Sequence, residues 1–430
     1  LHFSMNPKTD LLPALAQKVG TPFWIYDADL LRKRIADIQY ITSTPGVHAR
    51  FAMKSCPATK VLKEMKAASI GIDAVSGNEV LRALAAGYQG GQDPAEVCLT
   101  CDVFRDNALD VVLKHNVLPN IGSPGQIRDL ALAGYKGGIS VRVNPGFGHG
   151  HVNACDTGGP SSKHGIWFED FAKINQAAQE AGFAIHMLHA HIGSGPQFDE
   201  LVENLTRLAE EFASFLPQLP ELRAVSLGGG IPHNYRDPSV KVPLDRLKDL
   251  FANCHALLNK AAGREIRLEI EPGRYYVAPT CNLVSRVTDV KETRDNEKGS
   301  GVKFVMVDAG FVDLVRPAMY GSFHRITVLP HDGAVRTEEP IVVAGPLCES
   351  GDVFTRDDQE LLQPRQLPLP EAGDLLVLHD AGAYGYAMSS NYNSIGKAPQ
   401  LWLEPDGKVE MISRRENLGD LLKAECSEAV

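Results

Sequence analysis

The sequence has few cysteines, no block of basic residues and no long apolar run. Its eight cysteines are spread irregularly over 430 residues, which predicts reduced thiols in a cytoplasm rather than a disulfide framework. With 53 acidic against 43 basic residues, the net charge of −10 argues against nucleic acid or an anionic membrane as a partner. No apolar run approaches the ~18 residues of a membrane span, and we expect no signal peptide. The length predicts two or three domains.

Eight short apolar segments recur in the first two thirds of the chain. Each is too short for an ordinary helix and ends in Gly, Pro, Ser, Asn or Cys, which predicts a buried strand. The segments are His48–Ser55, Gly71–Ser76, Val97–Cys101, Pro119–Ser123, Gly138–Asn144, Ala184–Gly193, Ala224–Gly230 and Ile266–Gly273. Stretches with helical spacing separate them, among them Thr59–Ala68, Phe168–Ala181 and Leu244–Ala262. This alternation favours an α/β fold with a closed (β/α)8 barrel, which we expect over residues 36–285.

The pattern changes near Asn282 to strands without intervening helices. The runs NLVSRVTDVKET, KFVMVDAG, IVVAGP, DLLVLHD and QLWLEP are separated by Gly, Pro and Asp turns. They predict an all-β sandwich or barrel domain over residues 286–430. The segment Pro22–Asp29 also has strand character, so residues 1–35 are expected to join that domain and bring the two chain ends together.

In a (β/α)8 barrel the chemistry lies at the carboxyl ends of the strands. Four of these predicted ends carry Lys54, His191–Gly195, Gly228–Gly230 and Glu271–Arg274. A partly desolvated lysine is a good amine nucleophile, a glycine triplet exposes backbone N–H groups to a phosphate, and a carboxylate can keep a pyridine nitrogen protonated. Together these are the parts of a pyridoxal phosphate site.

Each of these features has a plainer interpretation when it is taken alone. A lysine at a strand end is usually solvated surface, GGG is usually a loop, and the run EPGR can be a capped turn with a surface ion pair. Their joint placement at four strand ends favours the functional interpretation.

The motifs FAMKS, HAHIGSG, SLGGG, EPGRYYVA, RPAMYG, GPLCESGD and GAYGYAMSSNYN resemble, in this order, those of the fold type III pyridoxal phosphate-dependent decarboxylases. Within that family they are most similar to the diaminopimelate decarboxylases, and RVNPGFGHGH followed by SKHGIW is similar to one bacterial branch of these enzymes. The resemblance covers nearly the whole chain after Met5. It implies a barrel followed by a β-domain, which agrees with the independent prediction.

The resemblance also implies roles for matching residues around the cofactor. Lys54 would attach pyridoxal phosphate covalently, His191 would stack on its ring, and Glu271 would pair with its pyridine nitrogen. The remaining cofactor-binding positions would be Ser194, Gly228, Gly229, Gly230, Gly273, Arg274 and Tyr384.

A second set of matching residues would hold the substrate. Arg274, Arg316 and Tyr320 would bind a distal carboxylate, Tyr384 would touch both phosphate and substrate, Glu349 would bind a distal ammonium, and Cys348 would protonate the product. In the family the loop with Cys348 and Glu349 reaches the cofactor of the neighbouring subunit, which implies a homodimer with shared active sites.

The activity implied by the resemblance is decarboxylation of meso-2,6-diaminopimelate to L-lysine and CO2, the last step of lysine biosynthesis. A protonated pyridine ring is a full electron sink, so Glu271 favours decarboxylation over racemisation. One alternative is a paralogue acting on D-lysine, D-ornithine or a secondary-metabolite precursor. Another is an inactive homologue that only binds the cofactor, although such a protein should have lost Lys54 or Cys348.

Two patterns could suggest a metal. Cys98 and Cys101 form a C-x-x-C motif, but no second pair follows, and residues three apart on a strand face opposite ways. The histidines 149, 151, 186, 189 and 191 are explained by cofactor contact at His191 and by loop or core packing elsewhere. We therefore expect no metal.

Overall fold

The computed structural model describes residues 9–148, 157–193 and 197–426. The chain divides into two compact units. The barrel unit comprises residues 32–234 and 239–276, and the β unit comprises Leu1–Leu31, Tyr235–Pro238 and Val277–Val430. The barrel unit begins at residue 32 and the second part of the β unit at residue 277, which is four and nine residues before the predicted boundaries at 36 and 286. Helix α2 (Ala28–Ile41) begins before the first predicted boundary, and β11 (Cys281–Glu292) begins before the second and pairs within the β unit.

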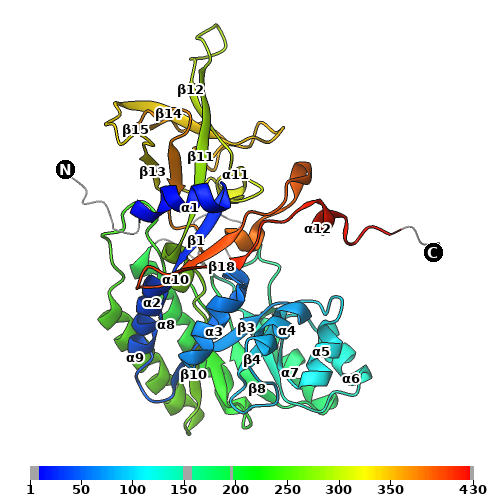
Figure 1. Ribbon diagram of the computed structural model, residues 1–430. Helices are drawn as coiled ribbons and strands as arrows, with labels where there is room; N and C mark the ends of the chain where they lie inside the picture. The colour runs from blue at the N-terminus through cyan, green and yellow to red at the C-terminus, as the bar shows by residue number, and fades with distance from the viewer. Residues whose placement is uncertain (1–8, 149–156, 194–196, 427–430) are drawn as a thin grey trace. The chain divides into compact units, whose positions relative to one another are not determined.

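Eight parallel strands close on themselves in the barrel unit, as the sequence predicts (Figure 1). They are β2 (Val47–Ala52), β3 (Gly71–Ala74), β4 (Val97–Cys101), β5 (Leu118–Ile121), β6 (Ile139–Asn144), β8 (Ile185–His189), β9 (Ala224–Ser226) and β10 (Arg267–Ile270). Pairing of β10 with β2 and of β5 with β6 completes the ring. A two-residue strand, β7 (Ile166–Trp167), adds to β6 outside the ring. We call the end of the barrel at the carboxyl ends of these strands the mouth.

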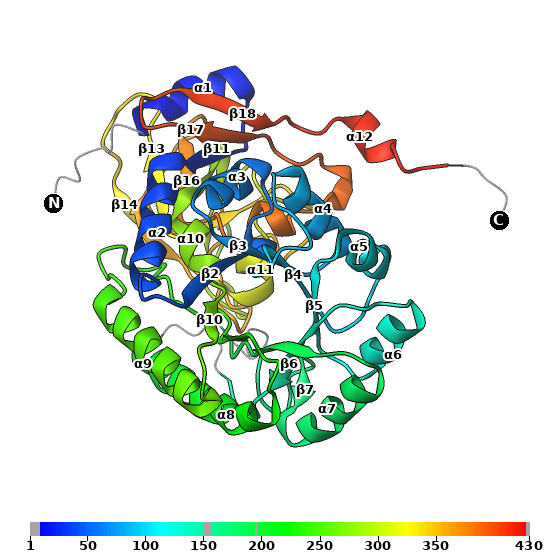
Figure 2. The ribbon, with the colours of Figure 1, turned by 90° about the horizontal axis from the view of Figure 1, so that it is seen from below.

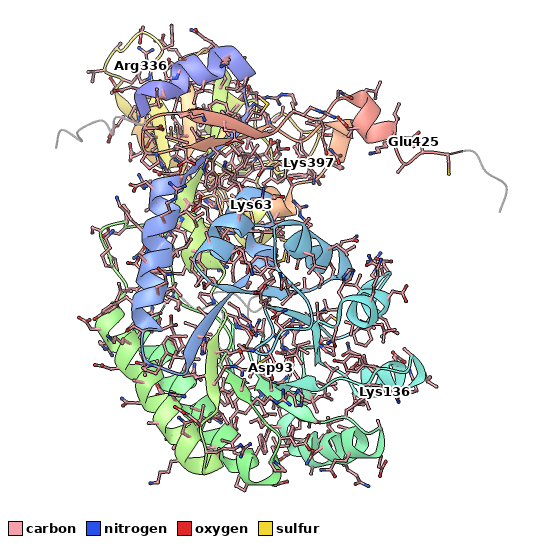
Figure 3. The ribbon with its side chains drawn as sticks, turned by 60° about the horizontal axis from the view of Figure 1, so that its bottom comes forward. Lys63, Asp93, Lys136, Arg336, Lys397 and Glu425 are labelled. Carbon is pink, nitrogen blue, oxygen red and sulfur yellow. The ribbon has the colours of Figure 1, made fainter. Side chains whose placement is uncertain are left out.

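Helices surround the strands, as the view of Figure 2 shows for the barrel unit. They are α2, α3 (Thr59–Ala67), α4 (Gly77–Ala85), α5 (Ala108–His115), α6 (Gly125–Leu132), α7 (Phe171–Glu180), α8 (Phe198–Phe215) and α9 (Leu244–Ala262). Each buries an apolar stripe, such as Leu201, Leu205, Leu208 and Phe212 of α8. Charged side chains outside the barrel include the exposed Lys63 and Lys136, which are labelled in Figure 3.

The barrel interior contains both apolar and polar side chains. Cys98, Met187 and Ala224 form an apolar cluster inside it. Nearby, Arg50 binds Glu269 through two hydrogen bonds of 2.6 and 3.2 Å, with both side chains at most 4% exposed. Further polar side chains follow towards the mouth, and Asp73, Thr100, Asn120 and Ser140 among them are joined by hydrogen bonds.

A nine-stranded mixed sheet forms the β unit. Strand β1 (Phe23–Asp27) lies in it between β11, which runs antiparallel, and β17 (Gln400–Leu403), which runs parallel. The predicted strand at Pro22–Asp29 therefore does join the later strands. The other strands are β12 (Lys303–Val307), β13 (Ile326–Leu329), β14 (Glu338–Ala344), β15 (Arg365–Pro368), β16 (Leu375–Leu378) and β18 (Val409–Ser413).

One face of this sheet is covered near β1 by helix α1 (Leu12–Val19). Leu12 and Ala16 of the helix belong to the same buried cluster as Phe23 and Ile25 of β1. On β1, Trp24 and Tyr26 contact other aromatic rings, those of Tyr386 and Trp402. Successive side chains of β1 point to opposite faces of the sheet, and both faces are covered from Phe23 to Tyr26. In the described part of the chain we find no helix with the length and apolarity needed to cross a membrane.

Candidate active site

Lys54 lies in a single turn of 3-10 helix, η2 (Met53–Ser55), directly after β2. The turn is closed by Cys56 N, which donates to Met53 O at 3.0 Å, and by the Ser55 hydroxyl, which donates to Ala52 O at 2.8 Å. This leaves the lysine half-buried at the mouth. Burial raises the pKa of Asp73 to about 6, an effect that Glu271 increases and the Lys54 ammonium opposes. The three charges therefore act on one another at the mouth.

Glu271 follows β10 and is 5% exposed. Its two carboxylate oxygens have different partners: His189 Nε2 lies 2.8 Å from Oε2, and the Ser226 hydroxyl donates to Oε1 at 2.8 Å. Burial alone would raise the pKa of Glu271, but the electrostatic attraction and hydrogen bond of His189 and the bond from Ser226 hold it below its ordinary value. The mouth therefore contains a buried, ionised carboxylate.

His191 also lies at the mouth, two residues after the end of β8. The Gly229 backbone N–H donates to its Nδ1 at 3.1 Å. Burial and then the positive charge of Lys54 place the pKa of His191 well below the usual 6.5. The ring is therefore neutral, with its proton on Nε2.

The glycine triplet after β9 is required by close backbone contacts. A Cβ on Gly228 would lie 2.4 Å from Ala190 O, one on Gly229 would lie 2.6 Å from Glu271 O, and one on Gly230 would lie 2.7 Å from Gly193 O. Gly228 and Gly230 also have φ angles of +71° and +109°, which side chains disfavour.

The N–H groups of this triplet are not equivalent. Gly228 N donates to the Ser226 hydroxyl at 3.2 Å and Gly229 N to His191. Gly230 N makes no hydrogen bond to the described residues, so it is the N–H group of the triplet best placed to bind an anion. Gly273 is a second close approach, because a Cβ there would lie 3.0 Å from Ala52 O.

The barrel unit thus brings together most of the predicted cofactor residues. They are Lys54, His191, Gly228, Gly229, Gly230, Glu271, Gly273 and the half-buried Arg274, which begins α10 (Arg274–Val277). Ser194 lies outside the described residues.

A hydrogen-bonded chain of side chains near the mouth was not anticipated from the sequence. Asp73 of β3 accepts from Thr100 of β4, which accepts from Asn120 of β5 at 3.0 Å, and Asn120 accepts from Ser140 of β6 at 2.8 Å. All four side chains are buried. The signal available in the sequence was a polar residue within each of four mainly apolar strands.

Asp102 and His164 form a second unanticipated pair, just after β4. His164 Nδ1 lies 2.8 Å from Asp102 Oδ2, and Gly165 N donates to Oδ1 at 3.3 Å. Burial would raise the pKa of Asp102, but the His164 hydrogen bond and the charge of Arg142 bring it below its usual value. The motif SKHGIW had drawn attention to this stretch, without a role for His164.

The remaining predicted residues belong to the β unit. Arg316 begins the short helix α11 (Arg316–Tyr320) and is 3% exposed. Its Nη1 donates to His324 Nε2 at 2.9 Å, and its guanidinium lies 4.8 Å from the ring centre of Tyr235. Since His324 Nδ1 lies 2.9 Å from His379 O, His324 donates there and accepts from Arg316, so it holds the guanidinium without cancelling its charge. Tyr320 is half-buried at the end of the helix.

Cys348 and Glu349 are exposed on the loop between β14 and β15. Cys348 N donates to Asn393 Oδ1 at 3.1 Å. The buried carboxylate of Asp352 accepts from Leu347 N at 2.8 Å and from Phe311 N at 2.7 Å. The loop therefore presents both side chains outward from an anchored backbone.

Tyr384 has a left-handed backbone with φ of +57°. Such a conformation costs a non-glycine residue of the order of 1 kcal/mol and persists where the surroundings impose it. The neighbouring Gly385 packs closely, because a Cβ there would lie 2.1 Å from Ala381 O. This strain is typical of a functional loop.

The C-x-x-C motif has a structural explanation. Cys98 belongs to the apolar cluster inside the barrel, and Gln126 Nε2 lies 3.5 Å from Cys101 Sγ. Burial raises the pKa of the Cys98 thiol far above its usual value and that of Cys101 to about 11. Both side chains are therefore protonated thiols at neutral pH.

Comparison with known proteins places these observations in one family. Residues 30–278 match the family model of the pyridoxal-dependent decarboxylases, pyridoxal binding domain. The chain is 37% identical to a diaminopimelate decarboxylase of Escherichia coli K12, over 99% of each chain. It is 38% identical to that of Streptomyces coelicolor, over 96% of this chain and 91% of the relative.

Solved structures agree with the sequence comparison. A crystal structure of a diaminopimelate decarboxylase matches with a TM-score of 0.89 at 36% identity, covering 98% of both chains. The Helicobacter pylori enzyme, solved in complex with L-lysine, matches with a TM-score of 0.83 at 28% identity, covering 96% of this chain and 98% of that one. The chain therefore belongs to the diaminopimelate decarboxylase family of pyridoxal phosphate-dependent decarboxylases.

Proposed function

We propose that this protein decarboxylates meso-2,6-diaminopimelate to L-lysine and CO2, the last step of lysine biosynthesis. The observation that carries the proposal is the ionised, buried Glu271 at the same mouth as Lys54. The full-length similarity to the E. coli enzyme and the L-lysine bound by the H. pylori relative support this substrate.

The residues of the mouth fit pyridoxal phosphate. The glycine triplet lies in close backbone contacts that exclude any Cβ, and Gly230 N makes no hydrogen bond to the described residues, as a phosphate site needs. We propose that Gly228, Gly229, Gly230, Gly273, Arg274 and Tyr384 surround the phosphate and that Ser194 helps to hold the cofactor. Neutral His191 suits stacking on a cationic ring, because it adds no repelling charge.

When bound, the cofactor withdraws electrons from the α-carbon of the substrate, and it does so most strongly with its ring nitrogen protonated. Glu271 is the residue proposed to hold that proton. Its low pKa keeps the carboxylate ionised at neutral pH, so it can accept an N–H hydrogen bond. Lys54 is proposed as the amine to which the cofactor is attached, and its place directly after a buried strand limits its motion.

A second group of residues is proposed to bind the far end of the substrate. Arg274, Arg316, Tyr320 and Tyr384 would bind the distal carboxylate, and Glu349 the distal ammonium. Arg316 supports this because its buried guanidinium is oriented by His324 and Tyr235. A site built to bind a charged group rejects substrates that lack that group.

We propose that Cys348 donates the proton that replaces CO2, and that it does so at the site of a partner subunit in a homodimer. Its exposure on an anchored loop, beside Glu349, supports an outward-facing role. A two-fold axis would create two equivalent composite sites. We also propose a reducing, cytoplasmic location, which the seven free cysteines among the described residues support.

Release of CO2 by the purified protein with added pyridoxal phosphate tests the proposal. The substrates to compare are meso-diaminopimelate, D-lysine, L-lysine and L-ornithine. We expect fast release from diaminopimelate alone. Preferred release from D-lysine or L-ornithine would refute the substrate assignment, and no release from any of them would refute the activity.

A further inference from the structure

His189 and Ser226 hold the Glu271 carboxylate from two sides. His189 ends β8 and Ser226 ends β9, while Glu271 follows β10, so three consecutive strands of the barrel supply the group. The His189 and Ser226 side chains are 1% and 0% exposed. Both hydrogen bonds to Glu271 measure 2.8 Å.

The hydrogen-bond partners determine which atoms carry the protons. Ser226 has one hydroxyl proton, which it donates to Glu271, and it accepts from Gly228 N. His189 Nδ1 is buried and makes no hydrogen bond to the described part of the chain. Since the ionised carboxylate can only accept, His189 donates to it through Nε2.

The two hydrogen bonds have a consequence for the carboxylate. They fix its orientation, because each oxygen is held by a different buried side chain. Each carboxylate oxygen has two lone pairs, so two remain for another donor after His189 and Ser226 are satisfied.

We propose that His189 is a positioning residue that, together with Ser226, orients the charged Glu271 carboxylate towards the ring nitrogen of the cofactor and keeps that nitrogen protonated. The proposal rests on the pyridoxal phosphate site of the proposed function, but not on the identity of the substrate. His189 itself acts only through Glu271.

Two variants of similar shape separate hydrogen bonding from packing. In His189→Gln the amide N–H can replace the Nε2 donor, whereas His189→Met fills similar space without a donor. We expect His189→Met to lower kcat about 10- to 100-fold, the range for a hydrogen bond to a charged group, with KM changed less than about threefold. We expect His189→Gln to retain kcat within about threefold. His186→Gln is the control, since His186 lies near the other end of the same strand, where its ring is next to Gly138.

The direct measurement is the 15N resonance of the cofactor ring, recorded with labelled pyridoxal phosphate and without substrate. The wild type, His189→Gln and His186→Gln should show a protonated ring nitrogen, and His189→Met a shift towards the unprotonated position. A protonated ring together with a wild-type kcat in His189→Met would overturn the proposal. Equal losses in His189→Gln and His189→Met would also overturn it, because they would indicate packing.

A double substitution tests whether His189 acts through Glu271. In a Glu271→Gln background, His189→Met should have almost no further effect on kcat or on the ring resonance. Full additivity would contradict the proposal. If His189→Met does not fold, Ser226→Ala replaces it and should shift the ring resonance in the same direction by less, and an unshifted resonance would overturn the proposal.

The two proposals fail differently. A wild-type protein whose bound cofactor has a protonated ring, but which releases no CO2 from diaminopimelate, refutes the proposed function. In that case the ring resonance of His189→Met still decides the role of His189.

Discussion

Replacing Glu271 with glutamine removes one charge from the mouth and nearly preserves the shape of the side chain. The carboxylate accepts hydrogen bonds from His189 and from Ser226. The glutamine oxygen can retain the first bond, and its NH2 group can donate to the Ser226 hydroxyl, which then accepts. We therefore expect the variant to fold with the same contacts.

The expected effect on stability is small because two terms oppose each other. A hydrogen bond to a charged group contributes about 1.5–3 kcal/mol and one between neutral groups about 0.5–1.5 kcal/mol, so the two bonds together lose about 2 kcal/mol. The variant also no longer buries a carboxylate that is 5% exposed, which offsets this loss. We expect Tm to change by only a few degrees.

The expected effect on catalysis is larger and has one sign. The bond to the protonated ring nitrogen loses its charged acceptor, which costs at least about 1–2 kcal/mol, and nothing offsets it. At about 1.4 kcal/mol for each factor of ten, kcat should fall at least about 5- to 30-fold. Affinity for pyridoxal phosphate should change less than about threefold, because most of the proposed contacts lie at the phosphate and at Lys54.

Release of CO2 at saturating cofactor measures kcat, reconstitution of the apoprotein measures cofactor affinity, and thermal unfolding measures Tm. A wild-type kcat in Glu271→Gln would refute the assigned role. A fall in Tm of more than about 10 °C with a proportionate loss of cofactor would show that Glu271 supports the fold instead.

Four further predictions follow from the same structure. Lys54→Ala should lose the visible absorbance of the bound cofactor and all turnover, and normal activity would refute the attachment site. Arg316→Ala or Glu349→Ala should reduce kcat/KM for diaminopimelate by a factor equivalent to about 2–4 kcal/mol of transition-state stabilisation. The loss should be much smaller for slow substrates that lack the distal carboxylate or ammonium, respectively. Equal losses on both kinds of substrate would indicate a structural role. Mixing the inactive Lys54→Ala and Cys348→Ala homodimers should restore about a quarter of wild-type activity, since half the dimers become mixed and each mixed dimer has one intact site. If the subunits exchange and activity does not rise, the active sites are not shared. Asp313 is 4% exposed, and burial raises its pKa to about 7, so it holds its proton in the folded state and disfavours folding as pH rises from about 4 to 7. Asp313→Asn should therefore increase the free energy of unfolding in urea by about 2–3 kcal/mol more at pH 8 than at pH 5. An equal increase at both pH values would contradict this.

The barrel could be predicted because each strand is locally marked. Eight apolar segments, each closed by a turn residue, match the eight strands, and the predicted helix Leu244–Ala262 is found with the same bounds. The predicted strand segments often ran too long, however: His48–Ser55 contains β2, which ends at Ala52, and then the turn with Lys54. The excess marks the places where the chain leaves the barrel to form the mouth.

The contacts between side chains could not be predicted from local pattern. His189 and Glu271 are 82 residues apart in the sequence. The series of hydrogen-bonded side chains from Asp73 to Ser140 involves four strands. A polar residue in an apolar strand can equally face a helix or the interior. The side it faces depends on the register of the strands and on closure of the barrel. Neither can be deduced from one segment of the sequence alone.

The sequence by itself determined the strands and helices of the barrel, the order of barrel and β-domain along the chain, and the residue types at the strand ends. It could do so because apolar periodicity and turn residues act over a few positions. Only the tertiary structure decided that β1 lies between β11 and β17, that Gly229 N is bound to His191, and that Glu271 is held ionised between His189 and Ser226. These features depend on which distant groups meet in a buried space. Burial makes each hydrogen bond there strong and each missing one costly, so the ionisation of the site is a property of the closed barrel.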